Sequence, residues 1–130
     1  SRVSRGLGDV YKRQAEGYPA GEMKHGPLAL IEEGMPVVVI APRDEHYKKT
    51  ISNMQEVISR GAKVLLITNK STDEIYSENI WEQIEVDAIS DELIPFLTTI
   101  PLQKLAYYSA LDKGYDIDKP RNLAKSVTVE

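Results

Sequence analysis

Lys125, near the end of the chain, carries the side chain of this sequence that is best suited to covalent chemistry. It lies in the small and apolar stretch NLAKSV, at residues 122–127. A lysine with the ordinary pKa of about 10.4 is neutral in only about one molecule in 2,500 at pH 7. Burial disfavours the charged form, so a partly desolvated Lys125 would become an amine nucleophile. The alternative is a solvated lysine, because a chain end frays unless something holds it.

His25 is the second candidate, and it lies just ahead of a predicted helix start. Pro27 suits the first position of a helix, and the sequence predicts one or two turns from there to Gly34. The positive end of such a helix disfavours the imidazolium form, so the ring would stay neutral and could accept a proton. The alternative is a histidine that satisfies local backbone groups.

Three short apolar runs predict the sheet that would position these residues. Residues 35–41 and 63–68 are continuous and rich in β-branched side chains, which is typical of parallel strands buried on both faces. Residues 80–86 predict a third strand, and Glu82 and Glu85 indicate an edge or a partly solvated position for it. Residues 69–79 are polar and without a period, and they predict a loop.

Two longer helices are predicted between and after these strands. Asp44 can cap a helix that runs to about Arg60 and ends at Gly61. Its core face is predicted at helical spacing by Tyr47, Ile51, Met54 and Ile58. A second helix is predicted over residues 91–113, with Pro95 tolerated in its first turn and Pro101 expected to kink it. Its apolar face is wide enough to require a partner subdomain or subunit.

Two motifs resemble the glucosamine-6-phosphate synthase family, whose members are isomerising glutamine–fructose-6-phosphate aminotransferases. Residues 15–31, AEGYPAGEMKHGPLALI, resemble the signature of the second sugar-isomerase (SIS) subdomain, and residues 120–130, PRNLAKSVTVE, resemble the catalytic tail. The similarity extends over residues 15–130. It implies an α/β fold, an open parallel sheet flanked by helices in a Rossmann-like three-layer arrangement, truncated at the N-terminus. A phosphosugar would bind near the carboxyl ends of the strands.

The resemblance also implies roles for four residues. Lys125 would form a Schiff base with the open-chain ketose phosphate. His25 would help to open the sugar ring, reaching the site from the neighbouring subunit of a homodimer. Leu123 and Ala124 match tail positions whose backbone lies against the sugar.

Several parts of the family's machinery have no counterpart in this sequence. The general base is a glutamate just upstream of Ala15, and neither Glu16 nor Glu22 matches it. The phosphate-binding hydroxyls belong to a first SIS subdomain, and the nucleophilic cysteine to a glutaminase domain. The chain has no cysteine. We therefore expect this fragment alone to be inactive.

Composition excludes other classes of function. The 130 residues hold 16 Lys and Arg against 20 Asp and Glu, and no basic stripe suggests nucleic acid. Two histidines and no cysteine argue against a zinc site, and we expect neither a metal nor an organic cofactor. No signal peptide or membrane span is expected, and the absence of cysteine fits a cytoplasmic protein.

Residues 1–14 do not fit the rest of the chain. They hold four basic residues and one acidic residue and have no helical or strand period. Residues 9–14, DVYKRQ, resemble the translation of a transposon end used in sequencing-library adapters. Our hypothesis is that residues 1–14 are a non-native, adapter-derived segment, with residues 15–130 as one SIS subdomain. A disordered basic arm is the alternative, and a native codon run matching residues 1–14 at the locus would contradict the adapter hypothesis.

Three rival functions stay open from the sequence. A sugar-phosphate-binding SIS module of a transcriptional regulator would carry a basic helix-turn-helix segment, which this sequence lacks. Another phosphosugar enzyme with an SIS domain would share residues 16–30 but should lack the tail motif. A dimerisation scaffold is possible for the fragment as it stands.

Overall fold

The computed structural model describes residues 15–69, 79–87 and 90–118. The described residues divide into two units, one within Pro19–Pro101 and one formed by residues 15–18 and 102–118. The tail of residues 120–130, the adapter-like residues 1–14 and most of the predicted 69–79 loop lie outside the described ranges.

The sheet has three parallel strands in the order β1-β2-β3. They are β1 (Pro36–Ile40), β2 (Lys63–Asn69) and β3 (Glu82–Val86). Val38 of β1 pairs with Leu65 of β2, and Ile67 of β2 pairs with Ile84 of β3. All three predicted strands are confirmed within two residues at each end, as is the edge position of β3. The open parallel α/β sheet of the sequence prediction is therefore confirmed.

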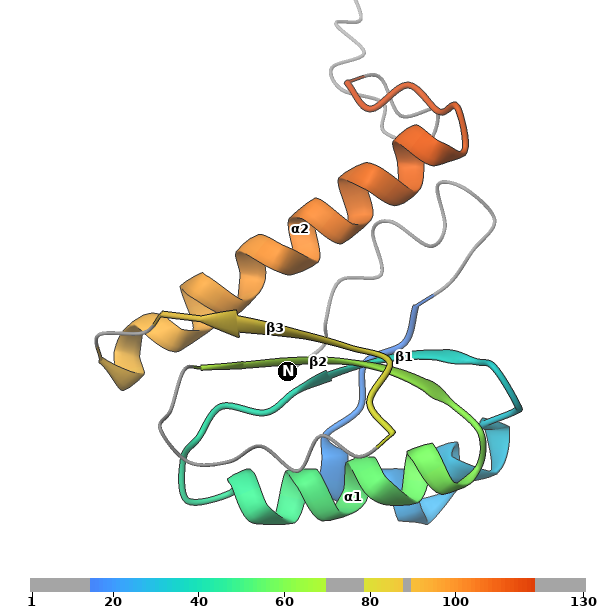
Figure 1. Cartoon of the computed structure of the whole chain (residues 1–130), viewed down its shortest axis with the longest axis vertical. Helices are drawn as coiled ribbons and strands as arrows, with labels where there is room; N and C mark the ends of the chain where they lie inside the picture. Colours follow the sequence, from blue (N-terminus) through green and yellow to red (C-terminus); the bar gives the residue numbers. More distant parts are fainter. Residues whose placement is uncertain (1–14, 70–78, 88–89, 119–130) are drawn as a thin grey trace, which may run out of the picture. The chain divides into compact units, whose positions relative to one another are not determined.

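Helix α1 (Tyr47–Ser59) connects β1 to β2 and lies along one face of the sheet (Figure 1). Its predicted core face is confirmed, because Ile51 and Met54 are buried and Tyr47 and Ile58 pack against the same cluster. The rest of this cluster is formed by Ala41, Val57, Ala62, Val64 and Leu66. Burial of such a cluster is the main stabilising term of a domain of this size.

Helix α1 begins two residues later than predicted, with His46 rather than Asp44 as its N-cap. The Asp44 carboxylate accepts a hydrogen bond from the His46 backbone N–H at 2.8 Å, and the Asp44 carbonyl accepts one from Tyr47 N–H at 3.1 Å. Asp44 therefore builds a local turn that competes with the helix and precedes it. The predicted end is confirmed: Gly61 has φ of +89° and donates its N–H to the Ile58 carbonyl at 2.8 Å.

The prediction that β1 is buried on both faces was wrong. Val37 and Val39 pack against the core cluster, but Val38 between them is 39% exposed. Alternate side chains of a strand point to opposite faces, and β1 is an edge strand of the described sheet. The continuous apolar pattern is borne out by β2 instead, where Val64, Leu66, Ile67 and Thr68 are fully buried.

Helix α2 (Ile94–Asp112) follows a short 3-10 turn, η3 (Asp91–Leu93), and continues through Pro101. The Thr98 hydroxyl donates to the Ile94 carbonyl at 2.9 Å and the Thr99 hydroxyl to the Pro95 carbonyl at 2.6 Å. Such back-bonding bends helices, and the kink at Pro101 stays a prediction. No helix within the described ranges is long and apolar enough to cross a membrane.

The C-terminus of α2 is closed by a paired hydrogen-bond motif. Gly114 has φ of +70° and donates its N–H to the Leu111 carbonyl at 2.9 Å, while Tyr115 N–H donates to the Ala110 carbonyl at 3.0 Å. This is a Schellman motif, in which only a residue that tolerates positive φ reverses the chain cheaply. Gly114 therefore sets the direction in which the chain leaves α2.

Candidate functional site

His25 is the last residue of a short 3-10 helix, η1 (Ala20–His25), and it is exposed. Gly26 follows with φ of +140°, a conformation that side chains rarely adopt, and Pro27 opens a second 3-10 helix, η2 (Pro27–Leu30). Within the described part of the chain, the His25 side chain makes no hydrogen bond or ion pair. His25 is therefore an exposed residue at the junction of two short 3-10 helices.

The helix predicted from Pro27 to Glu33 is shorter than expected. It has four residues, and Ile31 is already extended, with φ of −76° and ψ of 122°. Met35 N–H donates to the Glu32 carbonyl at 3.1 Å, so a turn leads from there directly into β1. The backbone dipole ahead of which His25 lies is that of a single 3-10 turn, which is much smaller than the dipole of a full helix.

Apolar packing fixes the segment that carries His25 to the domain. Met23, Leu28 and Ile31 pack against the core cluster, although no residue of η1 or η2 is fully buried. Two of these contacts flank His25, one on either side in sequence. The segment is therefore a surface element with an apolar underside.

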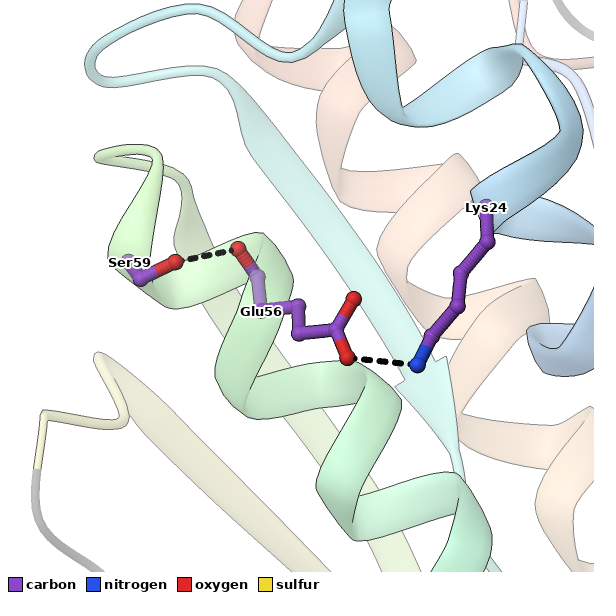
Figure 2. A network of polar contacts seen from close by, with 3 residues as sticks. All are labelled: Lys24, Glu56 and Ser59. Carbon is purple, nitrogen blue, oxygen red and sulfur yellow. Dashed lines mark hydrogen bonds and ion pairs between the residues drawn. The ribbon is translucent and has the colours of Figure 1, made fainter.

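An ion pair forms the second attachment of this segment. Lys24 Nζ lies 2.6 Å from Glu56 Oε1, with the two side chains 51% and 39% exposed (Figure 2). Glu56 belongs to α1, and the Ser59 hydroxyl donates to the Glu56 carbonyl at 2.7 Å. The sequence does not predict this pair, because its members are far apart along the chain and no local spacing connects them.

The upstream carboxylates hold local structural positions. The Tyr18 hydroxyl donates a hydrogen bond to the Glu16 carboxylate, and this bond raises the pKa of Tyr18 above its usual value. Glu22 lies in the first turn of η1, and its N–H donates to the Pro19 carbonyl at 2.9 Å. Neither arrangement indicates a general base.

The carboxyl ends of β1 and β2 are joined by polar contacts that the sequence patterns do not predict either. Arg43 N–H donates to Asn69 Oδ1 at 2.7 Å, and the Arg43 guanidinium lies 4.9 Å from the centre of the Tyr47 ring. The Thr68 hydroxyl donates to the Ala41 carbonyl at 2.7 Å. The signal that could have found them is their position at or close to the carboxyl ends of parallel strands, where α/β folds bind ligands.

Lys125, Leu123 and Ala124 lie outside the described residues. Of the four residues expected to act on the sugar, His25 alone therefore has a described environment. Among residues 15–69, 79–87 and 90–118, no group of three or more His, Cys, Asp or Glu could hold a metal ion.

Comparison with known proteins identifies the relatives of this chain. The family described as SIS domain matches residues 7–112. The glutamine–fructose-6-phosphate aminotransferase (isomerizing) of Brucella abortus biovar 1 (strain 9-941) is 53% identical over 124 residues, or 95% of this chain and 20% of that protein. The protein of the same name from Aquifex aeolicus (strain VF5) is also 53% identical over 95% of this chain, which is 21% of its own length.

A solved structure supports the same relationship. The C-terminal domain of glucosamine-fructose-6-phosphate aminotransferase from Francisella tularensis matches with a TM-score of 0.78 and 44% sequence identity. The match covers 85% of this chain and 31% of that one. The chain spans about a fifth of the length of the curated relatives that it matches.

Proposed function

Because the chain belongs to the SIS domain family, we propose that it is the C-terminal part of the isomerase domain of an enzyme that makes glucosamine 6-phosphate from fructose 6-phosphate and glutamine. The longer protein to which it would belong is called the parent protein below. The observation that carries the proposal is the similarity to aminotransferases of that name over 95% of the chain. A shared fold alone would not support a shared reaction.

Lys125 is the covalent residue of this proposal. Its neutral amine attacks C2 of the open-chain ketose phosphate, and loss of water leaves a Schiff base between Nζ and C2. The iminium form withdraws electrons from C1, which favours the proton transfer between C1 and C2. The backbone of Leu123 and Ala124 lies against the sugar and holds it beside the amine.

His25 opens the sugar ring in this scheme. The carbonyl that Lys125 attacks exists only in the open-chain form, so ring opening has to come first. A neutral imidazole can take the proton from the anomeric hydroxyl on C2 and return it to the ring oxygen as the bond between C2 and that oxygen breaks. The exposure of His25 supports its action on a site in the neighbouring subunit of a homodimer.

The parent protein supplies the remaining parts. The general base, the phosphate-binding hydroxyls and the glutaminase that releases ammonia are placed outside this chain, so the chain alone is inactive. The exposed apolar side chains of α2, among them Phe96 and Ile100, support a covering partner subdomain or subunit. We place the enzyme in the cytoplasm, and the reaction requires no metal or organic cofactor.

Substitution of Lys125 in the parent protein tests the proposal. Lys125→Ala should abolish formation of glucosamine 6-phosphate and leave glutamine hydrolysis intact, whereas the control Lys113→Ala should leave both reactions unchanged. If the Lys125→Ala variant still formed glucosamine 6-phosphate, Lys125 could not be the residue that forms the Schiff base. Turnover of fructose 6-phosphate by the isolated chain would contradict its proposed inactivity.

The origin of residues 1–14 is a separate proposal. We keep the hypothesis that they are adapter-derived, and a long read across the parent gene tests it. A codon run that encodes all fourteen residues at the native locus would contradict it.

A further inference from the structure

The segment that carries His25 is attached to the domain by contacts of two different kinds. Met23 and Leu28 bring apolar side chains against the core cluster. Lys24, directly before His25, makes an ion pair with Glu56 of α1 (Figure 2). We infer that this ion pair positions His25 for ring opening, an inference that rests on the proposed function.

The two kinds of contact constrain different motions. Apolar contacts are non-directional, so they hold η1 near the core without fixing its rotation about its own axis. A charge-assisted hydrogen bond is short and directional, and Lys24 Nζ meets Glu56 Oε1 at 2.6 Å. Because His25 follows Lys24 directly, a rotation that broke the pair would also turn the imidazole.

The far end of the pair is anchored more firmly than the near end. Met54 and Val57, on either side of Glu56 in α1, are 2% and 3% exposed, so the core fixes the backbone at Glu56. Lys24, at the other end of the pair, lies in η1, which ends at His25 and is followed by Gly26 with φ of +140°. Helix α1, which the core holds in place, therefore anchors η1. The residue directly after His25 is a glycine, whose backbone has few steric limits and does not fix the orientation of the histidine by itself.

The expected size of the effect follows from the exposure of the pair. Both side chains are partly in water, at 51% and 39% exposure, where ion pairs contribute little to folding. Loss of the pair should therefore lower kcat/KM with fructose 6-phosphate by about two- to fivefold, with the fold intact. A larger loss of kcat/KM would point to unfolding of the variant. The midpoint of thermal unfolding is therefore measured for each variant, and a midpoint equal to that of wild type excludes unfolding as the cause.

Two substrates separate positioning from general damage. Fructose 6-phosphate closes its ring through the C5 hydroxyl, so its 5-deoxy analogue stays open and needs no ring opening. In the parent protein, Lys24→Gln and Glu56→Gln should each lower kcat/KM for fructose 6-phosphate and leave that for the analogue unchanged. The double variant Lys24→Glu with Glu56→Lys restores the pair in reverse and should recover most of the loss.

Matched controls come from the same helix. Lys49→Gln removes an exposed lysine of α1 that makes no ion pair with the described residues, and Ser59→Ala removes a donor to the Glu56 backbone but not to its carboxylate. Both should keep the wild-type kcat/KM. Equal losses with the two substrates, or no recovery by the reversed pair, would overturn the inference. A wild-type parent inactive with fructose 6-phosphate would overturn the proposed function, and this inference with it.

Discussion

Strand β2 and helix α2 are both rich in apolar residues, but α2 leaves many more of its large apolar side chains exposed. In β2, Leu66 and Ile67 are fully buried. In α2, Phe96 is 71% exposed, and further large apolar side chains are also exposed. These are Ile100, Leu105, Tyr107, Tyr108 and Leu111, with Leu93 directly before the helix.

The comparison distinguishes an apolar surface that this chain itself covers, the face of the sheet under α1, from one that it leaves exposed, the apolar side of α2. The sequence supplies α1 to cover one face of the sheet, and the two bury a common cluster. Contiguous exposed apolar side chains usually mark an interaction site. The open surface of α2 therefore agrees with a chain that spans about a fifth of its curated relatives.

Shortening a side chain in the sheet core should lower the free energy of unfolding more than shortening one on α2. This is the largest effect that we predict. Leu66→Ala removes a side chain that is 0% exposed and should lower the free energy of unfolding by about 2–5 kcal/mol. Leu65→Ala, at its half-buried neighbour, should cost less. Chemical denaturation measures both, and a loss below about 1 kcal/mol at Leu66 would contradict a packed core there.

The open region should respond differently in the chain and in the parent protein. Phe96→Ala should change the free energy of unfolding of the chain by only about 0.5 kcal/mol, because surface substitutions are nearly neutral. In the parent, where we expect a partner to cover Phe96, the cost should rise to about 3 kcal/mol. The same cost in both contexts would mean that nothing covers this face of α2.

Two glycines with positive φ sharpen the comparison further. Gly114→Ala, after α2, meets no atom within 4 Å and should cost about 1 kcal/mol from backbone strain alone. Gly61→Ala, after α1, should cost more, because its Cβ would collide with the Glu33 carboxylate and lie 3.1 Å from Glu33 Cα. Thermal unfolding measures both variants. If adding Glu33→Ala to Gly61→Ala recovers none of the additional loss of stability, the collision with Glu33 is not the cause of that loss.

The smallest predicted effect is a pH dependence at the start of the α2 region. A hydrogen bond from the Ser90 side chain, helped by its own backbone N–H, lowers the pKa of Glu92 below the usual 4.5. A lowered folded pKa stabilises the fold above the unfolded pKa, and this contribution is lost as pH falls through the folded value. The stability difference between wild type and Glu92→Gln should therefore shrink between pH 6 and pH 3. If the stability difference grew as the pH was lowered, the pKa of Glu92 would be raised in the folded state, which would contradict the prediction.

Local patterns predicted the fold better than they predicted the site. The strands and the core face of α1 follow from periods that each segment carries by itself, and Gly61 ends α1 as expected. The exposure of Val38 could not be predicted, because it depends on where β1 stands in the sheet. The Lys24–Glu56 pair depends on tertiary folding for the same reason, and Lys125 was singled out by motif rather than by structure.

Borohydride trapping of fructose 6-phosphate on the parent protein tests the central claim most directly. The account predicts that reduction of the Schiff base leaves a stable adduct on Lys125, found by mass spectrometry of the peptide that contains residues 122–127. It also predicts no adduct in the Lys125→Ala variant. An adduct on another lysine, or none under conditions where the enzyme turns over, would contradict the account.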